Sequence, residues 1–93
     1  MPVDCLMEIV DRSDHRLIRL AGRLTSDQVH ELIGAARRSE RELRLDLGEL
    51  ISVDAVGLEV LHGLHRDGAK LLEVPAYIQL KLDGLSAKVA RQP

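Results

Sequence analysis

Hydrophobic and polar residues alternate over residues 43–47 and then change to a helical spacing. Leu43, Leu45 and Leu47 are separated by Arg44 and Asp46, the period-two pattern of a strand with one buried face. We expect residues 48–53 to form a loop. Apolar residues then recur three and four positions apart from Val56 to Leu64, as in an amphipathic helix. The pattern predicts a strand, a loop and a helix over residues 54–67.

Asp54 occupies the N-cap position of this predicted helix. A carboxylate there can accept hydrogen bonds from the first backbone N–H groups and interacts favourably with the positive end of the helix dipole. At the other end, Gly68 is suited to the left-handed conformation that often follows a helix. We therefore expect an exposed turn at Asp54, available for anion chemistry or for contact with a partner.

The N-terminal part of the chain predicts a hairpin followed by a helix. Two apolar segments, residues 5–10 and 16–21, flank a polar turn, and Gly22 is expected to end the second strand. Thr25 and Gln28 have the spacing of a capping box, in which the hydroxyl accepts from the backbone N–H three residues later. The predicted helix runs from there to about Ser39.

The C-terminal part predicts one more strand and one more helix. Residues 70–74 are strand-like, and Pro75 suits the start of a helix over residues 76–83. The alternating apolar residues of 76–83 also fit a strand, but we favour the helix. Residues 86–93 are expected to be frayed. With no further strand after residues 70–74, we also expect an open edge of the sheet, able to mediate homodimer formation.

These elements predict a single α/β domain over residues 1–93. A hairpin and two right-handed crossovers would give a mixed sheet of about four strands, packed by about three helices. Because residues 43–47 alternate in polarity, one face of the sheet should be better covered than the other.

Composition excludes several classes of function. The chain has no Phe or Trp and a single Tyr, so it lacks aromatic platforms for nucleic-acid bases, and its net charge of −2 favours neither nucleic acid nor anionic lipid. Cys5 is the only cysteine, which fits a reducing compartment. No signal peptide or membrane-spanning run is visible, so we expect a cytoplasmic protein without membrane insertion.

Several short motifs together resemble the signature of STAS domains, the family named for sulphate transporters and anti-sigma factor antagonists. The resemblance lies in residues 45–47 with their aspartate, the pair Leu50-Ile51, and Asp54-Ala55-Val56-Gly57-Leu58, which is similar to the family's Asp-Ser-Ser-Gly-Leu. Residues 22–25 resemble the family's turn before its first helix, and residues 68–75 its fourth strand and the start of its third helix. The resemblance implies a partner-binding surface. Its expected residues are Ser52, Asp54, Ala55, Val56, Gly57 and Leu58.

One departure from the family motif concerns regulation. The serine that accepts a phosphoryl group in anti-sigma factor antagonists corresponds to Ala55, and the second serine corresponds to Val56. Alanine has no oxygen to phosphorylate, so a charge switch of the usual kind cannot operate at position 55. Ser52 and Thr25 are nearby hydroxyls, but loop and capping roles explain them more simply.

The resemblance implies a non-enzymatic interaction module whose partner is an anti-sigma serine kinase. An alternative within the same family is an accessory subunit of a lipid transporter that binds the transport ATPase. A small enzyme is a remote alternative, because no Gly-rich phosphate loop, nucleophile elbow or metal-ligand set is present. His62 and His65 share a helix face but have no obvious further ligands, so we expect no metal and no cofactor. The negative charge of Asp54 also disfavours nucleotide binding at the turn.

Overall fold

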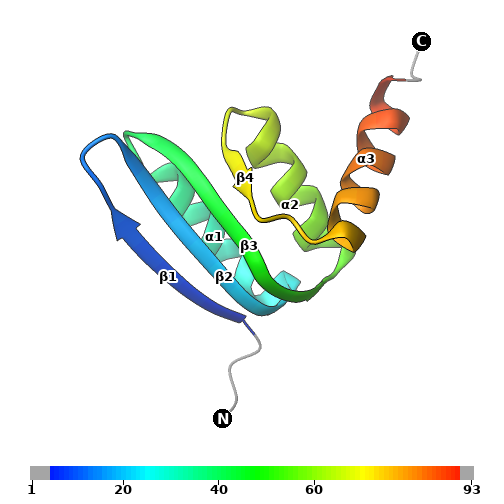
Figure 1. Ribbon diagram of the computed structural model, residues 1–93, viewed down its shortest axis with the longest axis horizontal. Helices are drawn as coiled ribbons and strands as arrows, with labels where there is room; N and C mark the ends of the chain where they lie inside the picture. Colours follow the sequence, from blue (N-terminus) through cyan, green and yellow to red (C-terminus); the bar gives the residue numbers. More distant parts are fainter. Residues whose placement is uncertain (1–4, 91–93) are drawn as a thin grey trace.

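The computed structural model describes the backbone of residues 5–90 and the side chains of residues 5–85. Four strands form one sheet in the order β1-β2-β3-β4 (Figure 1). Their bounds are β1 (Cys5–Asp11), β2 (His15–Leu24), β3 (Glu42–Val53) and β4 (Lys70–Leu72). β1 pairs with β2 antiparallel, whereas the β2–β3 and β3–β4 pairs are parallel. The predicted mixed α/β fold is confirmed.

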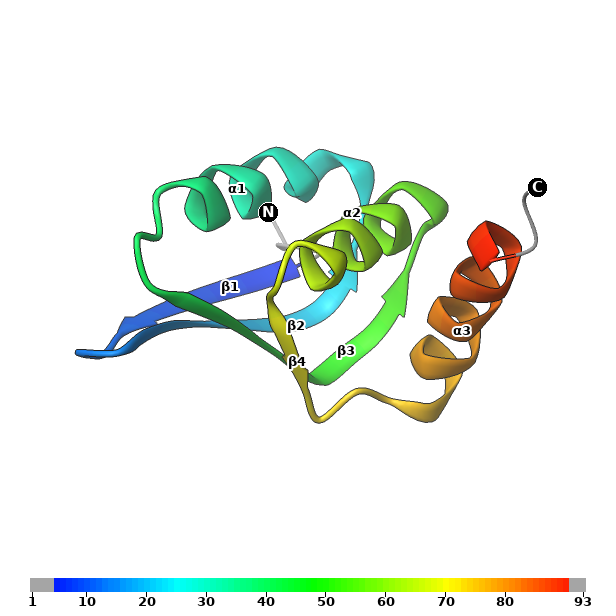
Figure 2. The same cartoon turned by 90° about the horizontal axis from the view of Figure 1, so that it is seen from above.

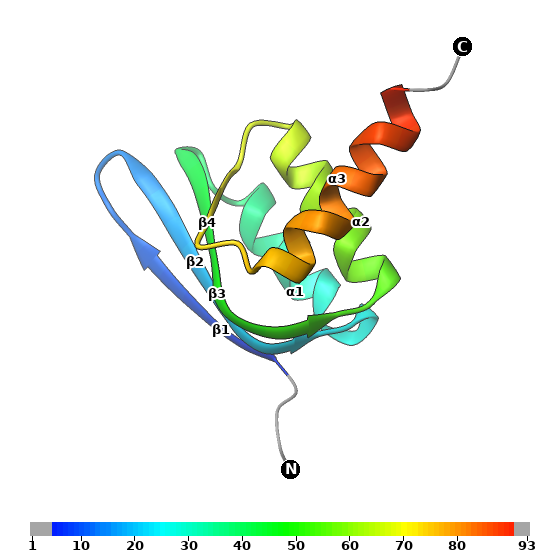
Figure 3. The same cartoon turned by 45° about the vertical axis from the view of Figure 1, so that its right-hand side comes forward.

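Three helices accompany the sheet: α1 (Ser26–Arg37), α2 (Ala55–Arg66) and α3 (Ala76–Ala90). Figure 2 shows α1 and α2 side by side above one face of the sheet, while α3 lies beyond the end of β3. Figure 3 shows α3 crossing next to α2, where its Ile78 and Leu82 are buried. The other face of the sheet carries no helix among the described residues, as the alternation in residues 43–47 predicted.

The core between the sheet and the helices is aliphatic. Ile18 of β2 and Leu45 of β3 are paired neighbours and are both fully buried. The largest fully buried side chains are Ile18, Leu20, Leu24, Leu32, Leu45, Leu47, Leu61 and Ile78. Burial of each such side chain contributes about 1.5–3 kcal/mol, so this cluster provides most of the force that holds α1 and α2 on the sheet.

Ion pairs cross the uncovered face of the sheet. Arg19 on β2 lies between Glu8 on β1, at 3.0 Å, and Asp46 on β3, at 3.5 Å. Nearer the start of β3, Glu42 accepts from Arg44 at 2.7 Å and lies 3.2 Å from Lys70, and these cations lower the pKa of its carboxyl group. Ion pairs at a protein surface contribute about 0–1 kcal/mol each. These pairs therefore make this face of the sheet polar but add little to the stability of the fold.

The expected loop over residues 48–53 is wrong, because β3 continues to Val53. The strand keeps its pairing with β2 through two register shifts, and Gly22, which was expected to end β2, lies inside the strand with φ of 93°. Gly48 donates its N–H to Asp46 at 3.0 Å next to the first shift. A bulge places an extra residue in one strand and so interrupts the alternation of polarity, which explains why these residues read as a loop.

The C-terminal boundaries also differ from expectation. β4 ends at Leu72 instead of residue 74, because Glu73 adopts a left-handed φ of 54° and Pro75 opens α3. The predicted helix over residues 76–83 continues to Ala90, so residues 86–90, expected to be frayed, are helical, while residues 91–93 lie outside the described residues. The prediction for Gly68 is confirmed, since its φ is 117° and its N–H donates to His65.

A hydrogen bond links α3 to the end of β3. The Tyr77 hydroxyl donates to the Leu50 carbonyl oxygen at 2.7 Å, and burial raises the pKa of this phenol, so it remains a donor at neutral pH. Replacing Tyr77 by Phe should lower the free energy of unfolding by about 0.5–1.5 kcal/mol. Chemical denaturation would measure this loss. Amide exchange should accelerate selectively in α3, and unchanged exchange there would contradict the proposed link.

Candidate functional site

The carboxylate of Asp54 caps two helices at once. Its Oδ1 accepts from the Gly57 backbone N–H at 2.7 Å in the first turn of α2, and its Oδ2 accepts from the Ser26 backbone N–H at 2.9 Å at the start of α1. The Asp54 N–H donates to the Leu24 carbonyl oxygen at 3.0 Å. The first N–H groups of a helix have no partner within the helix, and here one side chain satisfies two of them in different helices.

The capping box predicted at Thr25 is absent. The Thr25 side chain makes no capping hydrogen bond and instead donates to Gln28 Oε1 at 2.6 Å, while the Gln28 N–H donates to the Thr25 backbone carbonyl. Asp54 lies 28 positions away in the sequence and provides the cap of α1. The position of Asp54 at the N-cap of α2 was predicted, whereas its second contact depends on how the parallel strands bring the two helix starts together.

Gly57 lets α2 approach the end of the sheet closely. A Cβ atom at this position would lie 2.8 Å from Val53 Cγ2 and 3.1 Å from Leu24 Cγ, too close for either side chain without movement. Because Gly57 is buried and its N–H is the donor to Asp54, the absence of a side chain is what allows the capping geometry to form. Its role is therefore to position the turn rather than to present a surface.

The six expected partner-binding residues differ in exposure. Ala55 and Val56 are exposed in the first turn of α2, with Val56 at 46%. Ser52, Asp54 and Leu58 are half-buried, and Gly57 is buried. We name residues 51–58 the Asp54 corner. The corner presents small and apolar groups outward, while the carboxylate of Asp54 is turned to the two helix starts.

Sequence reasoning missed three exposed residues with large hydrophobic side chains at this end of the domain. Ile51 is 70% exposed on β3, and on α3 Tyr77 and Leu80 are 37% and 73% exposed. The hydrogen bond from Tyr77 to Leu50 brings the first turn of α3 next to the end of β3. Leu80 follows three positions later on the same face of α3. A signal for Ile51 was present in the sequence, since Leu50-Ile51 breaks the alternation of polarity and only one of two such neighbours can face the core.

The other polar residues do not form a catalytic arrangement among the residues that the structure describes. No polar or charged residue there is buried, and no three His, Cys, Asp or Glu side chains gather as metal ligands. His65 Nδ1 lies 2.9 Å from the Ala69 carbonyl oxygen. Cys5 is buried in the core, which raises the pKa of its thiol and disfavours the reactive thiolate. Nor does any described helix combine the length and apolar character required to cross a bilayer.

Comparison with solved structures identifies the architecture. The crystal structure of an antisigma-factor antagonist, a STAS domain from Rhodobacter sphaeroides, matches with a TM-score of 0.57, covering 74% of this chain and 86% of that one. The chain has a STAS-like fold. Sequence identity over the match is 16%, so the similarity establishes the fold and leaves the partner open. No family model matches the chain, and no curated protein matches it at the level of sequence.

Ala55 occupies the first position of α2. Ala55 begins α2 directly after the Asp54 cap and is exposed, so its methyl group stands at the positive end of the helix dipole. A phosphate at this position would be accessible to a partner and would be favoured by the dipole. The side chain has no hydroxyl to accept it.

Proposed function

We propose that this STAS-like protein is a non-enzymatic interaction module of the cytoplasm that binds a partner protein through the Asp54 corner. The observation that carries the proposal is the exposure of Ile51 and Val56 beside a rigidly capped turn. Exposed apolar side chains on a fixed backbone lose little conformational entropy on binding, which favours a specific contact. The fold of an antisigma-factor antagonist supports the same role.

Charges around the Asp54 corner indicate the chemistry of the partner. Asp27 is exposed in the first turn of α1, next to the Ser26 N–H that Asp54 binds, and Glu59 is exposed one turn beyond Ala55 on α2. Arg23 is exposed and pairs with Ser52 in the strand register, so the apolar centre has neighbours of both signs. Such a surface is complementary to an apolar patch flanked by both basic and acidic groups. We infer that the partner is an anti-sigma serine kinase, as in the antagonist branch of the fold, and that Ala55 keeps this protein permanently in the binding form.

Replacing Val56 by Glu should abolish partner binding, because a charge would then be desolvated at the centre of the contact. The test is affinity purification from the source cells with the tagged protein as bait, followed by mass spectrometry. Leu6→Glu is the matched control, since Leu6 is 65% exposed on β1, two strands from β3 and outside residues 51–58. The parent and the control should retain a kinase, whereas Val56→Glu should not.

Three results would contradict this assignment. Retention of a transport ATPase by the parent and its loss from Val56→Glu would keep the corner but change the role to that of a transporter subunit. Equal capture by Val56→Glu and the parent would exclude the corner as the contact. If Leu6→Glu loses the partner and Val56→Glu retains it, the contact surface lies on β1.

Restoring a hydroxyl tests the regulatory part of the proposal. When the captured kinase and ATP are added, the parent should remain unmodified at position 55, and Ala55→Ser should gain a phosphate at that residue. Ala55→Asp should weaken partner binding, since it adds a negative charge where the family places phosphate. Phosphate mapped to Ser52 or Thr25 of the parent, or full affinity of Ala55→Asp, would contradict the inference that position 55 is a disabled switch.

A further inference from the structure

The end of the domain opposite the Asp54 corner contains an open pocket between α1 and α2. The two helices are tied together at their N-terminal ends by Asp54 and spread apart toward their C-terminal ends (Figure 2). The gap is a pocket of about 500 Å³, within the range of about 300–1,000 Å³ typical of binding pockets. Its apolar lining comes from both helices, from the start of β3 and from the turn before β4, including Ile33, Leu43, Val60 and Leu64.

Gly63 on α2 contributes to the size of this pocket. It lines the pocket, and a Cβ atom built at this position would have no neighbour within 4 Å. A glycine in the middle of a helix costs about 0.5–1 kcal/mol relative to alanine. No close contact requires glycine at position 63, in contrast to Gly57, where the neighbouring side chains leave no room.

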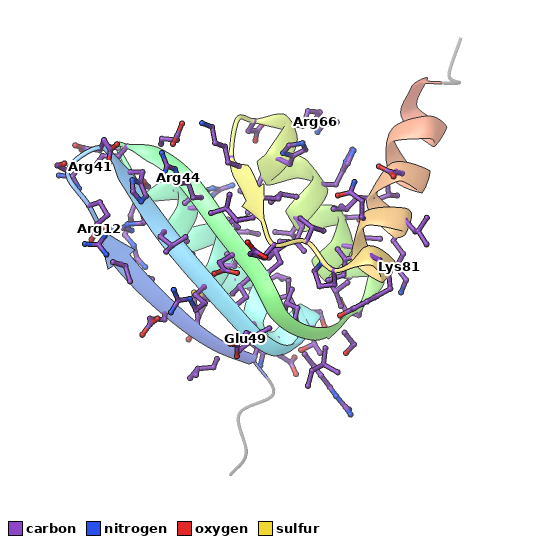
Figure 4. The ribbon with its side chains drawn as sticks, in the orientation of Figure 1. Arg12, Arg41, Arg44, Glu49, Arg66 and Lys81 are labelled. Carbon is purple, nitrogen blue, oxygen red and sulfur yellow. The ribbon has the colours of Figure 1, made fainter. Side chains whose placement is uncertain are left out.

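Unpaired arginines surround the pocket. Arg37 and Arg41 line it together with the carboxylates of Glu42 and Asp67, and Figure 4 shows Arg12, Arg41 and Arg66 along the same end of the molecule. Within the described part of the chain, the side chains of Arg12, Arg37, Arg38, Arg41 and Arg66 take part in none of the ion pairs.

The carboxylates at this end are largely occupied. Asp11 is held by Arg16 at 2.6 Å, and Glu42 by Arg44 and Lys70. The exposed carboxylate of Asp14 contacts only His15, which is neutral in the count of net charge, and those of Glu40 and Asp67 take part in none of the ion pairs. Three carboxylates therefore lack a permanently charged partner, against five unpaired arginines. The overall charge of −2 therefore conceals a basic end, because most of the remaining acidic residues lie toward the Asp54 corner and on the sheet.

We propose that this end is a second docking surface, which binds an acidic peptide segment of another protein by taking one apolar side chain into the α1–α2 pocket. The arginine rim would pair with Asp or Glu residues flanking the inserted side chain, and Arg37 and Arg41 are closest to that position. The proposal is independent of the Asp54 corner, so a scaffold of this kind could hold two partners at opposite ends.

Two other anionic partners fit the surface less well. Nucleic acid would not fill an apolar recess with its charged backbone. It would also lack an aromatic residue to stack on, because Tyr77, the only one in the sequence, contacts Leu50 near the end of β3. An anionic membrane is bound by apolar side chains that protrude, and none of the exposed large hydrophobic residues lines this pocket. An inserted peptide side chain uses both the recess and the charges around it.

Selection from a library of random linear peptides displayed on phage tests the proposal. Selected sequences should share an apolar residue flanked by Asp or Glu, and synthetic copies should bind the parent in fluorescence anisotropy with an affinity that falls as salt rises. Gly63→Leu, which fills the pocket, should weaken binding about tenfold or more. Arg37→Glu combined with Arg41→Glu should weaken it by at least a similar factor. Gly84→Leu is the matched control, since Gly84 is exposed on α3 with no neighbour within 4 Å of its built Cβ.

Several outcomes would overturn the proposal. These are the absence of enriched peptides, a neutral or basic consensus, or equal binding by Gly63→Leu and the parent. Anionic vesicles or duplex DNA that bind the parent and Gly63→Leu alike, but not the double arginine variant, would show a phosphate-binding surface instead. Sedimentation of the protein alone as a dimer that Gly63→Leu dissociates would show that the pocket binds a second copy. Thermal melting confirms that each variant is folded, and binding of the Asp54-corner partner by Gly63→Leu separates this test from the first proposal.

Discussion

Replacing Asp54 by alanine should lower the free energy of unfolding by about 2 kcal/mol, since each lost cap costs about 1 kcal/mol and two helix starts lose their acceptor together. Urea denaturation would measure the loss. Hydrogen exchange should accelerate at the amides of Ser26 and Gly57, the two donors, although they belong to different helices. Asp54→Asn, which keeps one acceptor oxygen, should give an intermediate loss.

Thr25→Ala is the control for this prediction. Thr25 precedes α1 and has the residue type of an N-cap, but its hydroxyl makes no capping hydrogen bond. Its replacement should cost about 0.5–1 kcal/mol, the value of its one hydrogen bond to Gln28. If Thr25→Ala is as destabilising as Asp54→Ala, or if exchange accelerates only at Gly57, the double cap is wrong. Because Asp54 supports the turn itself, Val56 is the better probe of partner binding.

Two identical substitutions in α2 should have opposite effects on stability. Gly57→Ala places a methyl group 2.8 Å from Val53 Cγ2 and should destabilise the protein by about 1–2 kcal/mol, because overpacking exceeds the gain in helix propensity. Gly63→Ala places the same group in open space and should stabilise the protein by about 0.5–1 kcal/mol.

Both variants replace glycine by alanine in the same helix, so the gain in helix propensity is common to both. The difference between their free energies of unfolding therefore reports the difference in packing. Denaturation midpoints of both should be measured against the parent under the same conditions. If both variants are stabilised, the approach of α2 to Leu24 and Val53 is looser than described. If both are destabilised, the space beside Gly63 is filled.

The elements were predictable wherever polarity follows a single period. Residues 43–47 and α2 each follow one period and were predicted correctly. The parallel pairing of β2 with β3 and of β3 with β4 was then predicted from the order of strands and helices. Prediction failed at Gly22 and Gly48, because a bulge changes the period within one strand. It also failed at the end of α3, where helix continues beyond the predicted residue 83.

The candidate site was predictable in position but not in its contacts. The sequence places Asp54, Ala55 and Val56 at the start of a helix, and they are found there. The bond from Asp54 to Ser26 joins segments that only the parallel pairing of β2 and β3 brings together. The basic end was hidden for the same reason, since its arginines come from the hairpin, from the end of α1 with the turn after it, and from the end of α2. Only Arg37 and Arg38 are adjacent in the sequence.

β1 has a consequence for how the protein behaves in concentrated solution. It lies at the outer position of the sheet, is seven residues long and exposes Leu6 and Ile9. Its outward backbone groups can template an added strand, the first step of aggregation. The charges of Glu8 and Asp11 interrupt the apolar run. Replacing both by neutral residues should therefore make the protein more prone to form fibrils on storage.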